Sequence, residues 1–261
     1  MRKWWGNFTP IIKRILLAAV IVVIAAVIVV SVVLWKKGAV EQEKVSKGIS
    51  FLKHLEEQDV SEISANISAV EAELNLEIAD TNESAVWSKF ANAVILGDSR
   101  AAGFSYYEFV PEERVLAKNG GKITDIPEYV EQLKALNPKL IFLCFGLNEV
   151  GIGLWPTVEA YNAVYEEQIQ LLMQELPNCT VYINSILPAV GSGLETNENY
   201  SKIGEYNQGL SSLCEEKEYH FVDNTQITKE HEDMYQEDGL HVKAEFYKYW
   251  AANMVTGVEE W

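Results

Sequence analysis

The chain has 261 residues and a formal net charge of −17, and 48% of its residues are hydrophobic. Residues 1–37 carry six Lys and Arg side chains and no acid; the other residues, 15 basic and 38 acidic, have a net charge of −23. This acidic composition excludes nucleic acid as a partner, because phosphate binding needs basic patches, and it disfavours adhesion to an anionic lipid surface. The three cysteines show neither a disulfide framework nor a metal-binding spacing, although a Cys179–Cys214 pair stays open.

The first predicted element is a membrane-spanning helix at residues 15–35. This run of 21 residues is uncharged and consists mostly of Ile, Val, Ala and Leu, which is long enough to cross a bilayer. Lys and Arg flank it on both sides. A cleaved signal peptide is the alternative, but the run is long for one and ends in Leu-Trp-Lys-Lys rather than in small residues. We expect residues 1–37 to form a cytoplasmic tail and a single-pass membrane anchor, with the rest of the chain extracytoplasmic.

Residues 38–85 are predicted to form a helical stalk or linker. Asp59 and Glu62 have the spacing of a helix start, and apolar residues then recur on one helical face. This amphipathic helix can pack on the following domain or self-associate with a second copy of the chain. A polar break at residues 80–84 places the domain boundary near residue 85, so that the main domain spans residues 86–261.

From residue 86 onward, apolar strand patterns alternate with helical ones. Strands are predicted at residues 93–96, 114–118, 139–145, 180–187 and 220–222. Helices are predicted from residue 125 and at residues 157–176, 203–213 and 244–255. Strands that are apolar throughout and alternate with helices indicate an α/β fold, with a parallel sheet of about five strands covered on both faces.

The candidate catalytic residues follow these strands. Ser99, Gly121 and Asn148 each come just after a predicted strand, and Asp238 and His241 come after the fifth strand and before the last helix. The carboxyl ends of parallel strands meet at one edge of a sheet, which is also where such sheets bind ligands. The sequence therefore predicts that these five residues form one site.

The chemistry of these side chains indicates nucleophilic catalysis. A serine hydroxyl needs a base to take its proton, so we expect Ser99 to be the nucleophile and His241 the general base. Asp238 would then orient His241 and stabilise its charged form. The backbone N–H groups of Ser99 and Gly121 and the side-chain amide of Asn148 are the candidate donors to an oxyanion.

Two alternatives remain open at this stage. Gly120 can replace Gly121 as an oxyanion donor. Asp223 and His231 form a rival dyad, which ranks below the pair of Asp238 and His241. The acids around His231 are typical of an exposed charge run rather than of a metal site.

In their order along the chain, four blocks resemble the SGNH hydrolase superfamily, also called GDSL-like esterases and lipases. The blocks are Gly97-Asp98-Ser99, Gly120-Gly121, Gly146-Leu147-Asn148 and Asp238-x-x-His241, within residues 92–255. The resemblance implies a three-layer α/β/α sandwich of flavodoxin-like fold, ester hydrolysis by a Ser-His-Asp triad, and no metal or organic cofactor. Two residues depart from the family pattern: Arg100 replaces the common Leu, and Glu149 the common Asp. Glu149 leaves the local support of Asn148 in question.

These features together predict a membrane-anchored serine esterase. Its expected substrate is a small-molecule or glycan ester with a short acyl group, such as O-acetyl, at the cell surface. An acyltransferase with the same triad, and a catalytically inert surface scaffold, are the competing interpretations.

Overall fold

The computed structural model describes residues 70, 73–256 and 258. The predicted anchor at residues 15–35 and most of the predicted stalk lie outside the described residues. Among the residues that are described, no helix is both long enough and apolar enough to cross a membrane.

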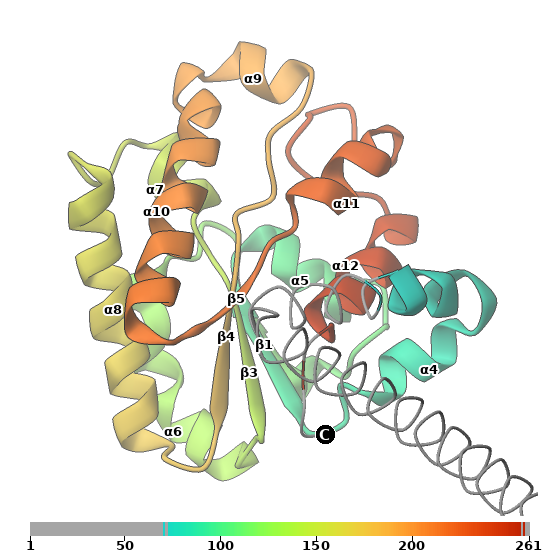
Figure 1. The fold of residues 1–261 in the computed structure, drawn as a ribbon, viewed down its shortest axis with the longest axis vertical. Coiled ribbons are helices and arrows are strands. Elements are labelled where there is room, and N and C mark those ends of the chain that lie inside the picture. Colours follow the sequence, from blue (N-terminus) through green and yellow to red (C-terminus); the bar gives the residue numbers. More distant parts are fainter. Residues whose placement is uncertain (1–69, 71–72, 257, 259–261) are drawn as a thin grey trace, which may run out of the picture. The chain divides into compact units, whose positions relative to one another are not determined.

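A five-stranded parallel sheet forms the centre of the domain, in the order β2-β1-β3-β4-β5 (Figure 1). Its strands are β1 (Ala93–Gly97), β2 (Val115–Ala117), β3 (Leu140–Cys144), β4 (Thr180–Asn184) and β5 (His220–Val222). All five residues of β1 and of β3 are buried, because helices cover both faces of the sheet. The predicted sheet is confirmed.

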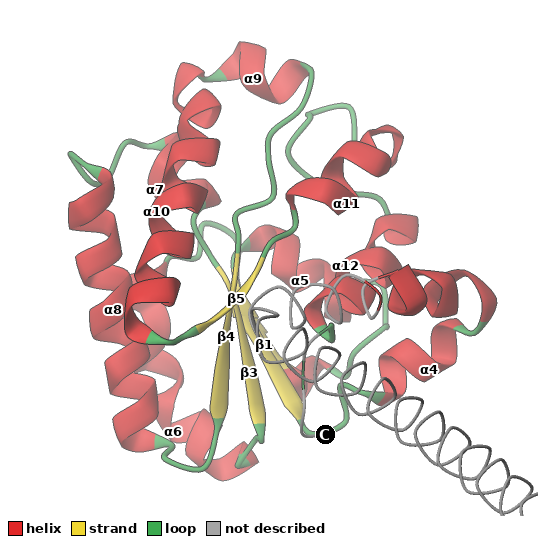
Figure 2. Ribbon diagram, viewed as in Figure 1, coloured by secondary structure: helices red, strands yellow, loops and turns green. Residues whose placement is uncertain are grey.

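The helices divide into two layers, one on each face of the sheet (Figure 2). The α-helices are α4 (Glu83–Ser88), α5 (Ser99–Tyr106), α6 (Ile126–Leu136), α7 (Leu147–Gly151), α8 (Val158–Glu175), α9 (Ser192–Thr196), α10 (Ile203–Lys217), α11 (Thr225–Glu230) and α12 (Tyr247–Met254). Helices α6, α8 and α10 pack with one face, and α4, α5, α11 and α12 with the other (Figure 1).

Short 3₁₀ turns connect several of these elements. They lie at Glu112–Arg114, Ile123–Asp125, Glu198–Lys202, Glu232–Met234 and Ala244–Phe246. The last of these turns leads directly into α12, so the predicted closing helix at residues 244–255 consists of a 3₁₀ turn and an α-helix.

Residues just before the predicted domain boundary belong to the folded core. Residues 73–81 are helical, and Ala79 and Val86 are buried in the same cluster as α12. The Asp80 carboxylate accepts hydrogen bonds from Lys248 Nζ at 2.7 Å and from the Tyr249 hydroxyl at 2.6 Å. The described end of the expected stalk therefore packs on the domain, although the polar break there favoured a boundary.

Chain order and sheet order together locate the site. From β1 the chain moves outward to β2 at one edge, then returns to β3 on the other side of β1. A crevice opens at such a reversal, beyond the carboxyl ends of the two central strands. Ser99 follows β1 and Asn148 follows β3, so both lie at this reversal point.

Candidate active site

A tight turn at the end of β1 presents Ser99. Asp98 caps α5 by accepting a hydrogen bond from the Arg100 backbone N–H at 2.9 Å, and Ser99 is the first residue of the helix. A side chain at Gly97 would come within 2.6 Å of the Cys144 carbonyl oxygen and 2.4 Å of the Ala101 side chain. Glycine therefore allows β1, β3 and α5 to approach closely enough to make this turn.

Ser99, His241 and Asp238 form a continuous chain of hydrogen bonds. The Ser99 Oγ lies 2.9 Å from His241 Nε2, and His241 Nδ1 lies 2.6 Å from Asp238 Oδ2. A carboxylate only accepts hydrogen bonds, so the contact with Asp238 fixes the ring proton on Nδ1. Nε2 is then the acceptor for the serine hydroxyl, which is the arrangement a general base needs.

Asp238 remains ionised in this arrangement. Partial burial raises the pKa of its carboxyl, but hydrogen bonds from the His241 ring and from the backbone N–H groups of Leu240 and His241 outweigh burial and lower that pKa below its ordinary value. The side chains of Asp238 and His241 are 44% and 38% exposed, so this end of the hydrogen-bond chain lies at the surface of the domain.

The loop that carries Asp238 and His241 is held by the backbone on both sides. Gly239 adopts a positive φ of 65°, and a side chain there would come within 2.0 Å of the Val190 carbonyl oxygen. The Val190 N–H donates to the Gly239 carbonyl at 2.9 Å. A β-bridge between Tyr235 and Val242 closes the base of the loop, so the position of His241 does not depend on its side-chain contacts alone.

The structure separates the two glycines that were candidates for an oxyanion donor. Gly120 is exposed, and a side chain there would meet nothing within 4 Å. Gly121 is buried beside the serine turn, where a side chain would come within 2.7 Å of the Gly97 carbonyl oxygen. The Asn148 amide donates to the Gly121 carbonyl at 2.9 Å, so the predicted Gly and Asn blocks do meet.

The three candidate donors differ in their availability. The Gly121 N–H donates to the Lys118 carbonyl at 3.0 Å. The Ser99 N–H is the first of α5 and has no acceptor within its helix, because the first N–H groups of a helix lack one. Asn148 uses one of its two amide hydrogens on Gly121 and keeps the other. Within the described part of the chain, the Ser99 N–H and the second amide hydrogen of Asn148 therefore have no acceptor, whereas the Gly121 N–H has one.

The sequence profile of the GDSL-like lipase/acylhydrolase family matches residues 95–249, which include every residue of this site. The chain belongs to this family. It is an SGNH/GDSL-type hydrolase, as the four sequence blocks indicated.

Solved structures of similar fold include two that are described as GDSL-like lipases. A GDSL-like lipase of Bacteroides thetaiotaomicron is 18% identical, with a TM-score of 0.51, over 68% of this chain and 94% of its own. A structure from Parabacteroides merdae, also described as a GDSL-like lipase, is 16% identical, with a TM-score of 0.51, over 62% of this chain and 93% of its own. A search of curated proteins found no match. At these identities the structures support the fold of this GDSL-like hydrolase.

The first departure from the family pattern, Arg100, is buried. Its side chain is 3% exposed, lies 3.8 Å from the Asp98 carboxylate and donates to the Leu187 carbonyl at 2.7 Å. Burial raises the pKa of Asp98, and the charge of Arg100 opposes that rise. Arg100 therefore supports the serine turn from the interior of the domain, through its ion pair with Asp98. An ion pair of this kind is expected in so acidic a chain.

The second departure, Glu149, is the residue whose contacts sequence reasoning missed. Its carboxyl is 1% exposed, and Oε1 accepts a hydrogen bond from the Ile123 backbone N–H at 2.8 Å. Burial raises the pKa of this carboxyl to about 7. The replacement of the family's common Asp was the one signal in the sequence that pointed to this position.

The rival dyad of Asp223 and His231 does not form, because each of the two residues makes other contacts. His231 stacks on the Tyr249 ring, with 3.8 Å between ring centroids, and the Asp223 carboxylate accepts from the Thr225 N–H at 2.9 Å. Cys144, Cys179 and Cys214 are free thiols, so the pair left open by the sequence is not a disulfide.

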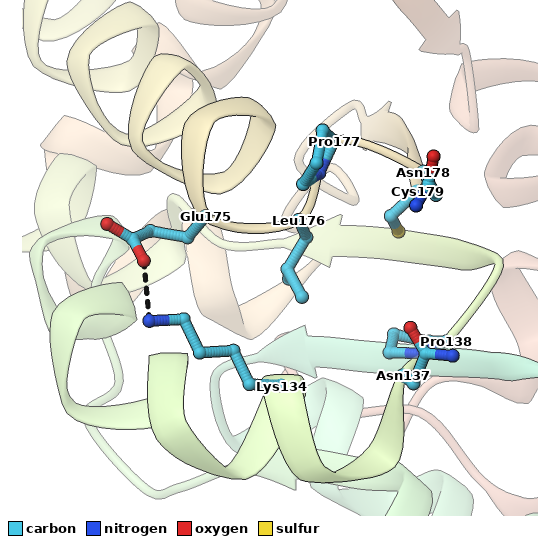
Figure 3. A pocket seen from close by; sticks show the side chains of 8 residues that line it. All are labelled: Lys134, Asn137, Pro138, Glu175, Leu176, Pro177, Asn178 and Cys179. Carbon is cyan, nitrogen blue, oxygen red and sulfur yellow. Dashed lines mark ion pairs between the residues drawn. The ribbon is translucent and has the colours of Figure 1, made fainter.

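An open pocket of about 140 Å³ lies at the amino ends of β3 and β4 (Figure 3). Pro138 and Cys179, which line it, precede the first residues of β3 and β4, whereas Ser99 and Asn148 follow the last residues of their strands. An ion pair between Lys134 and Glu175 crosses its rim (Figure 3). This pocket is separate from the candidate active site.

Proposed function

We propose that this GDSL-like hydrolase is a serine esterase in which Ser99, His241 and Asp238 form the catalytic triad. The observation that supports it is the unbroken hydrogen-bond chain from the Ser99 hydroxyl through the His241 ring to the Asp238 carboxylate. The Ser99 Oγ attacks the ester carbonyl while His241 takes the proton of the serine hydroxyl. His241 then delivers that proton to the departing alcohol. A water molecule, activated by the same histidine, releases the acyl group from the serine.

The oxyanion that forms in each step needs donors near Ser99. The Ser99 N–H and the second amide hydrogen of Asn148 supply two of them in this proposal. Removing one such donor typically costs about 3 kcal/mol of transition-state stabilisation. Gly121 contributes by letting its loop approach the serine turn, and its own N–H becomes a third donor only when it leaves the Lys118 carbonyl.

The proposed substrate is an ester with a short acyl group, O-acetyl above all, on a cell-surface glycan. The predicted anchor at residues 15–35 supports this choice, because it would hold the domain close to a membrane and outside the cytoplasm. To test the anchor, membranes that carry the full chain are washed at alkaline pH. We expect the full chain to remain with the membranes and a variant lacking residues 1–37 to be released; release of both contradicts the anchor.

Covalent labelling of the purified full chain with a fluorophosphonate tests the triad. Intact mass should show one adduct on the wild type, none on Ser99→Ala, and a rate at least about 10³-fold lower for His241→Ala. Ser105→Ala, on the same helix, and His231→Ala, outside the site, are matched controls that should label normally. A folded wild type that takes no adduct contradicts the triad and favours the scaffold interpretation.

Product analysis then separates a hydrolase from an acyltransferase. The enzyme is given an acetylated glycan together with an unacetylated acceptor glycan. We expect free acetate as the product. Acetyl groups found on the acceptor, without acetate release, would instead show that a sugar hydroxyl replaces water.

A further inference from the structure

Two consecutive residues at the start of α7 hold one loop of the site. Asn148 Nδ2 donates to the Gly121 carbonyl at 2.9 Å, and the Ile123 N–H donates to Glu149 Oε1 at 2.8 Å. The loop between these two bonds lies against the serine turn through Gly121. Glu149 thus fixes one end of the loop whose other end contacts the proposed oxyanion donor Asn148.

The second oxygen of Glu149 lies in an unusual place for a charge. Oε2 is buried and has no hydrogen-bond partner among the described residues, and the whole residue is 1% exposed. A buried carboxylate with an unpaired oxygen is costly, because water no longer solvates it. The same oxygen carrying a proton is far less costly to bury.

The groups that face Glu149 come from three elements. The carboxylate of Asp98, in the β1–α5 turn, disfavours a second negative charge, and Lys122, in the loop itself, partly offsets it. From α8, the buried hydroxyls of Tyr161 and Tyr165 interact electrostatically with it. Burial, with Glu149 among the further causes, raises the pKa of both tyrosines well above its ordinary value, so both hydroxyls stay neutral.

We propose that Glu149 is a positioning residue: its uncharged carboxyl holds the loop Gly121–Ile123 against Asn148, and ionisation of that carboxyl releases the loop. The inference rests on the proposed function, since it concerns the oxyanion site of the same triad. The ionised carboxyl gains solvation only by moving toward water, and that movement breaks its bond to the Ile123 N–H. Asn148 then loses the fixed carbonyl of Gly121 that orients its amide.

The dependence on pH follows from the burial of this group. The pKa of Glu149 is raised to about 7, mainly by burial and against the hydrogen bond from Ile123. Activity that depends on His241 as a base rises with pH, and a group that must stay protonated makes it fall again. Glu149 would therefore set the alkaline limb of the pH profile.

The test measures kcat and KM of the full chain for p-nitrophenyl acetate between pH 5.5 and 9.5, with Ser99→Ala as the blank. Glu149→Gln keeps an oxygen for the Ile123 N–H and never ionises. Glu149→Met has nearly the same length and offers no oxygen. Glu131→Gln, an 89% exposed glutamate on α6, is the matched control.

We expect wild type and Glu131→Gln to lose kcat above pH 7, by up to roughly tenfold per pH unit. Glu149→Gln should keep its kcat within about threefold between pH 7 and pH 9. Glu149→Met should lower kcat at least about tenfold at every pH, with little change in KM, because oxyanion donors act on the transition state rather than on substrate binding.

A difference infrared spectrum gives a readout that needs no activity. The C=O stretch of a neutral carboxyl should be present in wild type minus Glu149→Gln at pH 5.5 and fall to about half its intensity near pH 7. An alkaline limb that persists in Glu149→Gln, or a carboxyl band absent at pH 5.5, overturns the inference even if Glu149→Met fails to fold. A wild type that does not turn over the ester at all would instead contradict the proposed triad.

Discussion

Asp238 and Glu149 are both acidic residues at the edge of the sheet where Ser99 lies, but their surroundings are opposite. Asp238 lies on a loop, is 44% exposed and has three hydrogen bonds, which lower the pKa of its carboxyl. Glu149 is 1% exposed and has one oxygen without a partner among the described residues, and burial raises the pKa of its carboxyl to about 7.

This difference separates two tasks that acids perform around one serine. A carboxylate that must stabilise a charged histidine needs to stay ionised, and hydrogen-bond donors at the surface achieve this. A carboxyl that supports a buried loop serves better uncharged, and burial achieves that. We therefore expect changes at the exposed acid to affect activity with little change in stability, and changes among the buried groups to lower stability as well.

The largest expected effect is that of Asp238→Asn on activity. The amide keeps an oxygen for the Leu240 and His241 N–H groups, so the loop should stay folded. It removes the acceptor that keeps the ring proton of His241 on Nδ1, and kcat should fall roughly 10⁴-fold. Rates of ester hydrolysis and urea unfolding curves, measured on the same protein, check this. A large loss of stability would contradict the expectation that the exposed acid acts mainly on activity.

Arg100→Met tests the expectation that changes among the buried groups lower stability. This change leaves the Asp98 carboxylate without its cation and the Leu187 carbonyl without its donor. The free energy of unfolding should fall by about 4 kcal/mol, as for other buried ion pairs that lose one partner. Urea unfolding measures it. Lys134→Met, which removes the surface ion pairs with Glu131 and Glu175, is the control and should leave the unfolding midpoint almost unchanged.

The smallest of the three effects is the dependence of stability on pH at Glu149. Its pKa is raised from 4.5 in the unfolded chain to about 7 in the fold, so its contribution is complete below pH 4.5 and is lost as the pH rises to about 7. Relative to Glu149→Gln, wild type should lose about 3 kcal/mol of unfolding free energy between pH 4.5 and pH 8. Unfolding free energies that change in parallel with pH for the two proteins would contradict a raised pKa of Glu149 in the fold.

Most of the sheet and the position of the site were predictable because they depend on local patterns. The runs around Val94 and Ile141 are apolar at every position, which is typical of strands buried on both faces. Ser99 and Asn148 were predictable because each directly follows such a strand. The short helices α7 and α9, of five residues each, were not, because their sequences contain too few turns to show a helical period.

Contacts between distant segments account for what the sequence did not reveal. Glu149 meets Ile123 from 26 positions away, and Asp80 meets Tyr249 from 169 positions away. Neither pairing has a local pattern: in the sequence Glu149 is only a departure from a motif, and Asp80 is only part of a polar break. Tertiary packing decides whether such a residue is exposed or is part of the core.

Ser99 and His241 are 142 positions apart in the chain, which has a consequence for biosynthesis. The serine turn emerges from the ribosome long before its base, and α12, which follows the base, is buried in the core that completes the domain. A growing chain therefore presents a serine that has no proton acceptor. With the proposed triad, the serine stays unreactive until the segment that carries Asp238 and His241 and the α12 helix that follows it have folded into place.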